Sequence, residues 1–168
     1  MSRAQKPDID LRPIEERDTE FLYAVYASTR TEELAPLGWN EAQRESFLRM
    51  QNEAQHRDYW SNYDTSRFRI IVCDGVAAGR LYVERRENKL HIVDIAILPA
   101  FRNRGIGTTL ITRLFDEADA AALAVSIHVE YNNPAQRLYQ CLGFEFLDEA
   151  GDVYRLMERR PSQQRSVA

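Results

Sequence analysis

The chain has 168 residues, of which 44% are hydrophobic and 29% charged, a composition that suits one globular domain with its own core. Its net charge of −4 gives no support to a general nucleic-acid-binding role. No apolar run approaches the roughly 20 residues that cross a bilayer, and the first residues lack the apolar segment of a signal peptide. We therefore expect a cytoplasmic protein that binds neither nucleic acid nor a membrane.

The first part of the chain predicts one strand and two helices. Residues 1–7 show no periodic pattern and are expected to form a flexible leader. Residues 8–14 alternate apolar and polar side chains, which indicates a short edge strand. Asp18 is a candidate N-cap for a first helix, residues 31–40 hold a proline and a glycine and predict a loop, and residues 41–59 predict a second helix.

The next stretch is typical of a β-meander. Residues 68–73 and 76–85 are rich in strand-forming side chains, and the Asp74-Gly75 pair between them is a strong hairpin signal. A second turn follows at residues 87–89. Residues 90–98 are apolar almost throughout, which indicates a central strand covered on both faces. Three consecutive strands joined by short turns predict antiparallel pairing.

A helix is then expected over residues 105–121, because apolar side chains recur there at helical spacing. The stripe is formed by Ile106, Leu110, Ile111, Leu114, Phe115 and Ala118. A strand is expected at residues 124–129. Together with the meander, these elements predict a mixed α/β domain.

A short helix and a hairpin are expected near the end of the chain. Asn133-Pro134 is expected to open the helix with proline at its first position, and Gly143 to end it in a left-handed conformation. Residues 144–147 and 153–157 are expected to pair across a turn at residues 150–152.

The two cysteines are Cys73 and Cys141, and both lie within apolar segments. Free cysteine is among the most buried residue types, so we expect two buried free thiols. Their spacing does not resemble that of a metal site, and we expect no bound metal.

The stretch from Asp94 to Thr108 carries the strongest functional signal. It leads from the expected central strand, through a short basic turn, into a helix N-terminus, where unpartnered amides and the helix dipole favour an anion. Two glycines allow a phosphate to approach the backbone, two arginines add charge suited to phosphate, and a threonine offers a hydroxyl. These residues are Gly105, Gly107, Arg102, Arg104 and Thr108.

Other interpretations of this stretch are open from the residues alone. A glycine-rich turn between solvated arginines needs no ligand. A P-loop is excluded, because no Gly-Lys-Ser/Thr sequence follows. A dinucleotide site of the Rossmann type gains some support from Glu130, which lies at roughly the expected distance downstream. That fold, however, places a parallel βαβ unit near the start of its domain, and here a meander precedes the glycines.

Two motifs in this order resemble the GNAT superfamily of N-acetyltransferases. Residues 102–107, Arg-Asn-Arg-Gly-Ile-Gly, match its Q/R-x-x-G-x-G/A signature after a strand. Residues 132–144, Asn-Asn-Pro-Ala-Gln-Arg-Leu-Tyr-Gln-Cys-Leu-Gly-Phe, match its N-x-x-A-x-x-L-Y-x-x-x-G-F element. The resemblance covers about residues 8–158 and implies an α/β (α+β) fold, with a central mixed, mostly antiparallel sheet of about six to seven strands flanked by about four helices. We expect a single acetyltransferase domain over residues 8–160 and a disordered tail at 161–168.

The resemblance also implies acetyl-CoA as the acyl-donor substrate. In the family, main-chain amides of the turn and helix start bind the CoA pyrophosphate, and the preceding strand offers main-chain groups to the pantetheine arm. Asn132 matches a family asparagine near the cofactor, although local helix capping explains it equally well. Tyr139 matches the family tyrosine that protonates the CoA thiolate. The residues carried over to the acetyl-CoA site are Ile95, Ala96, Ile97, Arg102, Asn103, Arg104, Gly105, Ile106, Gly107, Thr108, Asn132 and Tyr139.

The general base is less clear from the sequence. Some family members carry a glutamate on the strand before the asparagine, but Glu130 is not cleanly placed for that role. His128 shares its strand face and has a suitable intrinsic pKa. Asp94 is a second candidate, because a carboxylate in an apolar strand requires a partner or a function. His91 is a third candidate, and a water chain without one dedicated base is also open.

The acceptor implied by the resemblance is a primary amine of a small molecule or a peptide. Residues 15–58, which the family uses around its acceptor, hold ten acidic residues against five arginines together with several aromatic side chains. Such a surface suits a cationic amine, although solvated helix faces over a core explain it more simply. The alternatives are a non-catalytic acyl-CoA-binding regulatory module and a nicotinamide-dinucleotide protein. A homodimer is compatible with the resemblance.

Overall fold

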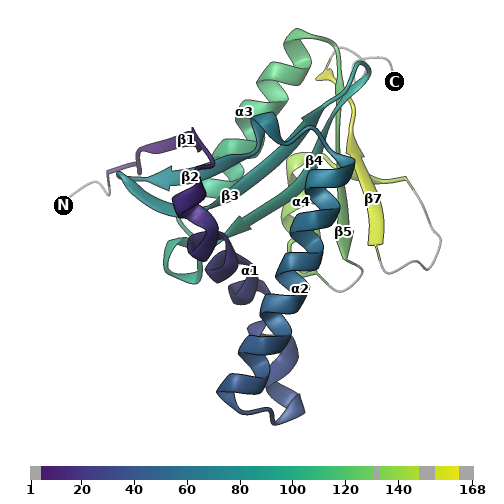
Figure 1. Ribbon diagram of the computed structural model, residues 1–168. Coiled ribbons are helices and arrows are strands. Elements are labelled where there is room, and N and C mark those ends of the chain that lie inside the picture. Colours follow the sequence, from purple (N-terminus) through teal and green to yellow (C-terminus); the bar gives the residue numbers. More distant parts are fainter. Residues whose placement is uncertain (1–4, 131–132, 148–153, 163–168) are drawn as a thin grey trace. The chain divides into compact units, whose positions relative to one another are not determined.

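The computed structural model describes residues 5–130, 133–147 and 154–162 (Figure 1). Within these residues the chain forms four α-helices, seven β-strands and four short 3-10 helices. In chain order the strands and α-helices are β1 (Ile9–Pro13), α1 (Thr19–Leu34), α2 (Glu41–Asn62), β2 (Arg69–Cys73), β3 (Val76–Arg85), β4 (Lys89–Ile97), α3 (Ile106–Ala120), β5 (Ala124–Glu130), α4 (Gln136–Leu142), β6 (Glu145–Phe146) and β7 (Tyr154–Arg159). The 3-10 helices η1 to η4 are Glu16–Asp18, Ala35–Leu37, Thr65–Arg67 and Pro99–Phe101.

The strands form a mixed sheet in the order β1-β2-β3-β4-β5-β7-β6. Antiparallel pairing joins β1 to β2, β2 to β3, β5 to β7 and β6 to β7, whereas β4 and β5 pair in parallel. The parallel pair is the one that a helix, α3, connects, as a parallel crossover requires. This arrangement confirms the predicted fold class.

The chain divides into two compact units, which are described separately here. The first unit holds Met1–Tyr82 with Ile95–Arg104, and the second holds Val83–Asp94 with Gly105–Ala168. The segment expected to bind the acyl donor therefore has its arginines in the first unit and its glycines in the second.

In the first unit, β2 and β3 form the predicted hairpin. Asp74 and Gly75 between them have φ of 50° and 81°, the left-handed conformations that this type of tight turn needs. The same turn holds the start of β1, because the Asp74 carboxylate accepts a hydrogen bond from the Asp8 amide at 2.9 Å and the Asp74 amide donates to the Asp8 carbonyl at 2.8 Å.

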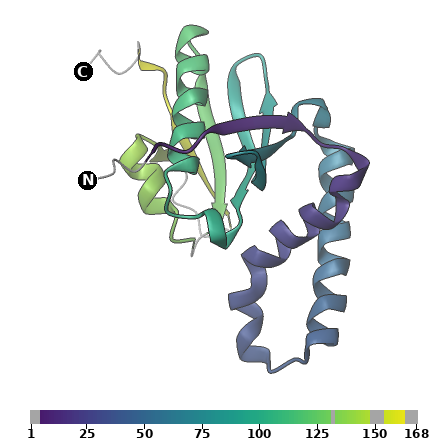
Figure 2. The ribbon, with the colours of Figure 1, turned by 90° about the vertical axis from the view of Figure 1, so that its left-hand side faces the viewer.

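The helices α1 and α2 lie side by side as a helical hairpin in the first unit (Figure 1 and Figure 2). The loop predicted at residues 31–40 is wrong in its first part, because α1 continues to Leu34 and η2 follows directly. The second helix begins at Glu41 as predicted. Its N-cap is Asn40, whose side chain accepts from the Gln43 amide at 2.8 Å while the Gln43 side chain accepts from the Asn40 amide at 3.0 Å.

Asp18 occupies the predicted N-cap position of α1, but its carboxylate does not cap that helix. Instead it accepts two hydrogen bonds from the Arg12 guanidinium, both at 2.8 Å, and one from the Glu15 amide at 2.8 Å. The Arg12 bonds lower the pKa of Asp18 to about 2. Asp18 is buried, so this ion pair fixes the end of β1 against the start of α1.

A register shift interrupts the pairing of β2 with β3. Ile71 pairs with Gly79, but the next residue, Val72, pairs with Ala77, so Ala78 is the extra residue of a bulge on β3. The Ala78 carbonyl accepts a hydrogen bond from the Leu98 amide at 2.8 Å. The bulge therefore sits beside the end of β4, within the first unit.

The core of the second unit is built on α3 and β5. All six side chains of the predicted apolar stripe on α3 are buried, which confirms that face of the helix. Ring packing extends the core to Phe144, the second residue after α4, because the Phe115 and Phe144 ring centroids lie 5.5 Å apart. The Arg159 guanidinium of β7 donates to both carboxylate oxygens of Asp119 on α3, at 2.7 and 3.1 Å. These contacts hold the final strand of the unit in place.

The end of α4 follows the prediction and its start does not. Gly143 follows the helix with φ of 109°, as expected for a left-handed C-terminal residue. The helix begins at Gln136, with Ala135 as its N-cap, so Pro134 is not at its first position. The Asn133 side chain instead accepts a hydrogen bond from the Ala135 amide at 2.9 Å, which closes a local turn before the helix. The predicted final hairpin is present as β6 and β7, and its turn at residues 150–152 lies outside the described residues.

The two cysteines differ in their surroundings. Cys73 is a buried free thiol as predicted, whereas Cys141 is exposed on α4, so that prediction is wrong. In the described ranges, no helix combines the length and apolar character that crossing a membrane requires.

Candidate active site

The segment that precedes the glycines belongs to the first unit. Ala96 of β4 is buried, and Ile95 and Ile97 on either side of it are half-buried. Gly79 of β3 packs directly against this segment, because a Cβ atom added to Gly79 would lie 2.2 Å from the Ala96 carbonyl oxygen. Only glycine allows the two strands to approach so closely here.

The two arginines of the motif turn toward their own unit. The Arg102 Nε donates to the Ile97 carbonyl at 2.9 Å, so this side chain folds back on the end of β4. The Arg104 guanidinium lies 5.5 Å from the centroid of the Phe101 ring. Asn103 between them has a φ of 63°, which asparagine tolerates better than most side chains. All three motif residues are exposed and form a tight basic turn.

The second half of the motif forms the N-terminus of α3 in the second unit. Gly105 is the N-cap residue with φ of 77°, and it has no side chain that could cap the helix. The Thr109 amide makes the first bond of the helix, to the Gly105 carbonyl at 3.0 Å. The amides of Ile106, Gly107 and Thr108 precede that bond, so the helix offers them to an anion. This helix start is the segment to which the family resemblance assigns the CoA pyrophosphate.

Tyr139 and Asp94 both belong to the second unit, and the charge of Asp94 acts on the Tyr139 phenol. Tyr139 of α4 is 7% exposed, and its ring centroid is 5.8 Å from that of Phe144. Burial, and secondly the charge of Asp94, raise the pKa of Tyr139 to about 12. The phenol therefore stays protonated at neutral pH and can act only as a proton donor there.

The two histidine candidates form a pair on neighbouring strands of the second unit. His91 is buried on β4, and its Nδ1 lies 2.7 Å from the Ser126 hydroxyl of β5. His128 is exposed on β5, with its ring centroid 5.1 Å from that of His91. Burial, followed by the nearby cations, lowers the pKa of His91 to about 4, so its imidazole is neutral at physiological pH.

The pairing of β4 with β5 covers only part of each strand. The register runs from Lys89 opposite Ala124 to Ile92 opposite Ile127. Both strands continue past that point, and Asp94 lies on the continuation of β4.

Two of the predictions about ligands concern Asn132 and metal binding. Asn132, predicted to lie near the cofactor, falls outside the described residues. Within the ranges that the structure describes, no group of three or more His, Cys, Asp and Glu side chains is arranged to hold a metal ion.

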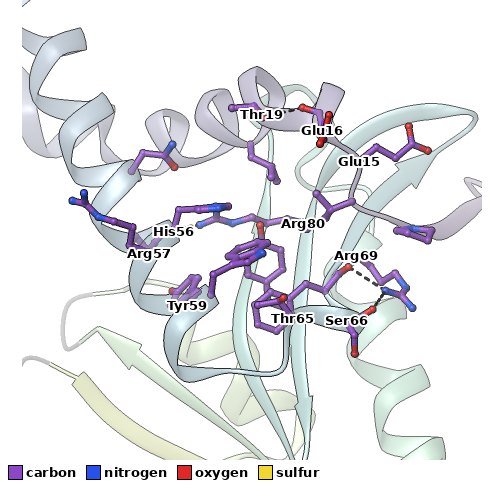
Figure 3. Close-up of a pocket in the computed structure, with 18 of the residues that line it drawn as sticks. Glu15, Glu16, Thr19, His56, Arg57, Tyr59, Thr65, Ser66, Arg69 and Arg80 are labelled. Atoms are coloured by element: carbon purple, nitrogen blue, oxygen red, sulfur yellow. Dashed lines mark hydrogen bonds between the residues drawn. The ribbon is translucent and has the colours of Figure 1, made fainter.

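A pocket of about 680 Å³ lies in the first unit (Figure 3). Its wall comes from the end of β1 and start of α1, the last turns of α2, η3, and strands β2 and β3. The residues that line it are Pro13, Ile14, Glu15, Glu16, Thr19, Leu22, Asn52, Glu53, Gln55, His56, Arg57, Tyr59, Trp60, Thr65, Ser66, Phe68, Arg69, Arg80 and Tyr82. Three carboxylates and three guanidiniums balance, so the pocket is not the acidic one that the composition of residues 15–58 suggests.

Arg80 of β3 is the buried cation of this pocket, with 4% of its surface exposed. Its Nη2 donates to the Gln55 side-chain oxygen at 2.9 Å, and its guanidinium lies 5.1 Å from the Tyr82 ring centroid. Desolvation, and secondly the Arg80 charge, lower the pKa of His56. The Arg69 guanidinium, by contrast, is held at the rim by the Ser66 carbonyl at 2.8 Å (Figure 3).

Aromatic rings form much of the remaining wall. The rings of Phe68 and Tyr82 stack with centroids 4.2 Å apart. Trp60 meets both of them edge-on, at 5.7 and 6.0 Å, and stacks on His56 at 3.9 Å on its other side. Trp60 is 37% exposed, so this cluster reaches the surface while its inner rings are buried.

The sequence interpretation missed Arg80 and Gln55. A signal for Arg80 was present, because this arginine is the one charged residue within the stretch from Val76 to Val83, as Asp94 is within the apolar end of the next strand. The contact between Gln55 and Arg80 joins residues 25 positions apart, and nothing in the helical pattern of α2 indicates it.

Known proteins with similar sequence or fold include several acetyltransferases. The probable N-acetyltransferase san of Drosophila melanogaster is 29% identical over 92 residues, which are 53% of this chain and 49% of that protein. This chain therefore spans about half the length of that relative. The PaiA N-acetyltransferase of Thermoplasma acidophilum, solved with coenzyme A, shares 20% identity and a TM-score of 0.66 over 91% of this chain and 99% of that chain. Arabidopsis thaliana Naa50, solved with the bisubstrate analogue CoA-Ac-MVNAL, shares 14% identity and a TM-score of 0.57 over 90% and 97%.

At these identities the solved structures show a common fold. The sequence evidence is more specific, because residues 20–144 match the acetyltransferase (GNAT) family, and that range is more than half of the chain. It contains both motifs, at residues 102–107 and 132–144. The chain belongs to the acetyltransferase (GNAT) family.

Proposed function

We propose that the chain is an N-acetyltransferase that moves an acetyl group from acetyl-CoA to a primary amine by direct attack on the thioester. The observation that carries this proposal is the uncapped start of α3 at Gly105, directly after the basic turn, in a chain of the acetyltransferase (GNAT) family. Amides at such a helix start favour the pyrophosphate of CoA. Neighbours of known structure were solved with CoA or a CoA-peptide conjugate, which supports the same donor.

The acyl donor would be held mainly by main-chain groups. The amides of Ile106 to Thr108 would bind the pyrophosphate, and the strand segment Ile95–Ile97 would hydrogen-bond the pantetheine arm. Since Arg102 donates a hydrogen bond to the Ile97 carbonyl, its first role would be to stabilise the turn that precedes α3. Arg104 is exposed and would supply positive charge near the phosphates.

Tyr139 would act as the general acid and Asp94 as the base. The neutral amine attacks the thioester carbon, the carbon–sulfur bond breaks, and the thiolate takes the phenol proton of Tyr139. The attacking nitrogen loses one proton to the Asp94 carboxylate, directly or through water. Asp94 would then return that proton to the phenolate, directly or through water, and complete the cycle. His128, exposed beside the buried His91, is the other candidate base.

The test is a thiol-release assay with acetyl-CoA and a panel of primary amines. We expect free CoA to appear in proportion to an N-acetylated product identified by mass spectrometry. A chain that binds CoA in calorimetry yet releases no thiol with any acceptor would instead be the non-catalytic acyl-CoA-binding module. Binding of NAD without binding of CoA would favour the dinucleotide interpretation.

A further inference from the structure

The pocket of the first unit has a tryptophan in its wall. Trp60, near the end of α2, is the largest side chain on the lining and is 37% exposed. Phe68 and Tyr82 lie behind it, each 1% exposed, with their rings stacked at 4.2 Å. Trp60 meets both of these rings edge-on, at 5.7 and 6.0 Å. The buried pair therefore supports the indole as an apolar surface at the pocket wall.

The side chains beside Trp60 extend this apolar wall. Tyr59 and Ile14 on the same lining are half-buried. His56 stacks on the indole, with ring centroids 3.9 Å apart. Desolvation, followed by the charge of Arg80, lowers the pKa of His56, so this imidazole is mainly neutral near pH 7. An apolar group that enters the pocket thus meets uncharged surface around the indole.

The charged groups of the lining balance and do not favour a charged ligand. The Arg80 guanidinium donates to the Gln55 side-chain oxygen at 2.9 Å, and the Arg69 guanidinium donates to two main-chain carbonyls at 2.8 and 3.2 Å. The remaining charges belong to exposed residues, where water screens them. These residues are Arg57, Glu15, Glu16 and Glu53. A ligand body without charge of its own suits this lining, because it brings no further charge to be desolvated.

The pocket adjoins the strand segment that the proposed function assigns to the pantetheine arm. Tyr82 of the lining lies on β3, as does Gly79, which packs against the Ala96 carbonyl of β4. All three residues belong to the first unit. Neighbouring strands of a sheet are about 5 Å apart. An amine on a short chain can therefore extend from the pocket toward that segment.

Building on the proposed acetyl transfer, we propose that this pocket selects a primary amine with an uncharged aromatic group, and that Trp60 determines this specificity. The aromatic group packs against the indole, in a volume of about 680 Å³ that lies within the range of small-molecule sites. The amine nitrogen forms the new bond to the acetyl carbon as the carbon–sulfur bond of acetyl-CoA breaks. The nitrogen loses one proton and the CoA thiolate gains one, so the products are the N-acetylated amine and free CoA thiol.

Two pairs of acceptors test the aromatic group, and the members of each pair differ only by a phenyl ring. Phenethylamine is compared with ethylamine, and phenylalaninamide, which resembles a peptide N-terminus, with alaninamide. We expect the ring to raise kcat/KM by about ten- to a hundredfold, the effect of burying it against the wall. The pair that shows the effect identifies the source of the aromatic group as a free amine or a peptide. Turnover without a ring effect in either pair would overturn the inference and leave the acetyltransferase activity intact.

Variants then test Trp60 itself. In Trp60→Leu the effect of the ring on kcat/KM should fall by about tenfold, because the wall loses its largest surface. Trp39→Leu is the matched control and should keep the full effect. Trp39 is also 37% exposed, but it packs edge-on against Phe47 and is not part of the lining. Circular dichroism and the midpoint of thermal unfolding establish that each variant is folded. A full ring effect retained in folded Trp60→Leu would sink the assignment.

Phenylalanine tests the preference for an uncharged group, because it carries a carboxylate where phenylalaninamide carries a neutral amide. We expect kcat/KM for phenylalanine to be no higher than that for phenylalaninamide. A tenfold advantage for phenylalanine would show that the pocket selects a charge and would overturn this part of the inference.

Tryptophan fluorescence tests the pocket without catalysis. The chain has two tryptophans, so Trp39→Phe leaves Trp60 as the single indole. The probe 2-phenylethanol, which has no amine, should change the emission of this variant saturably, whereas ethanol should not. In Trp60→Phe the emission of Trp39 should stay unchanged. The absence of a saturable response from Trp60 would overturn the inference. If no amine were acetylated by the unmodified chain, the proposed function would be wrong, and a saturable response would still support the aromatic pocket.

Discussion

The carboxylate of Asp94 lies near enough to the Tyr139 hydroxyl to raise the pKa of that phenol, in addition to the larger effect of burial. The two residues are 45 positions apart and belong to β4 and α4 of the second unit. A negative charge beside a phenol opposes formation of phenolate and favours its protonated form. Both effects keep the phenol protonated at neutral pH, which is the form that a proton donor requires.

Replacing Tyr139 by phenylalanine removes the proposed proton donor and little else. Because the ring is buried and packed near Phe144, the variant should fold normally. We expect kcat to fall by about a hundredfold, with little change in the KM for acetyl-CoA. Tyr154→Phe, at a tyrosine that is 53% exposed, is the matched control. Steady-state kinetics with one acceptor measure both, and an unchanged kcat in Tyr139→Phe would remove this residue from the mechanism.

Replacing Asp94 by asparagine should lower the pKa of Tyr139 from its value of about 12. The pKa should stay above the usual value near 10, because burial is the larger cause and remains. Tyrosinate absorbance during alkaline titration gives this pKa, as the difference between each background and the same background carrying Tyr139→Phe. Asp116→Asn, an exposed carboxylate on α3, serves as control. If Asp94→Asn titrated like the unmodified chain, the two groups would not be coupled in solution.

Much of the fold follows from local signals in the sequence. The Asp74-Gly75 turn was predictable because few residues adopt positive φ easily, and the buried face of α3 was predictable from spacing alone. The end of α1 was not predicted. The proline and glycine of residues 31–40 do mark a break, but they act after Leu34, where η2 already continues the helical path.

The candidate site could be predicted from the sequence only where its residues follow one another in the chain. The residues around Gly105 are contiguous, so their motif could be found directly in the sequence. The role of Arg80 depends on its contact with Gln55, which lies 25 positions away on α2. Asp94 and Tyr139 were each candidates by themselves, but their proximity depends on how β4 and α4 pack. Long-range contacts of this kind leave no local pattern.

Gly79 is expected to be intolerant of even one added methyl group. Its Cβ would lie 2.2 Å from the Ala96 carbonyl oxygen, a backbone atom that cannot rotate away. We expect Gly79→Ala to lower the free energy of unfolding by about 2 kcal/mol or more. Gly38→Ala is the comparison, since Gly38 has open space around it but a φ of 66°, and should cost about 1 kcal/mol. Urea unfolding measures both, and equal losses would show that the strands can separate at little cost.

His91 should make the stability of the protein depend on pH in the window between about 6.5 and 4. Its pKa in the folded chain is about 4, against 6.5 when unperturbed, chiefly because it is buried. Between these values the unfolded chain binds a proton that the folded chain does not, so stability falls as the pH is lowered through the window and is unaffected by His91 above it. The full contribution is about 3 kcal/mol. Asp18, with its pKa near 2, acts only at lower pH and does not interfere.

The measurement compares urea unfolding at several pH values for the unmodified chain and for His91→Gln. The variant loses the hydrogen-bonding contact between His91 and Ser126, so its stability should be lower at pH 7. Its stability should nevertheless change less between pH 6.5 and 4, because glutamine takes up no proton. The exposed His128, replaced by glutamine, should leave most of the pH dependence in place. Parallel curves for His91→Gln and the unmodified chain would mean that the buried imidazole binds a proton as readily in the folded chain as in the unfolded one.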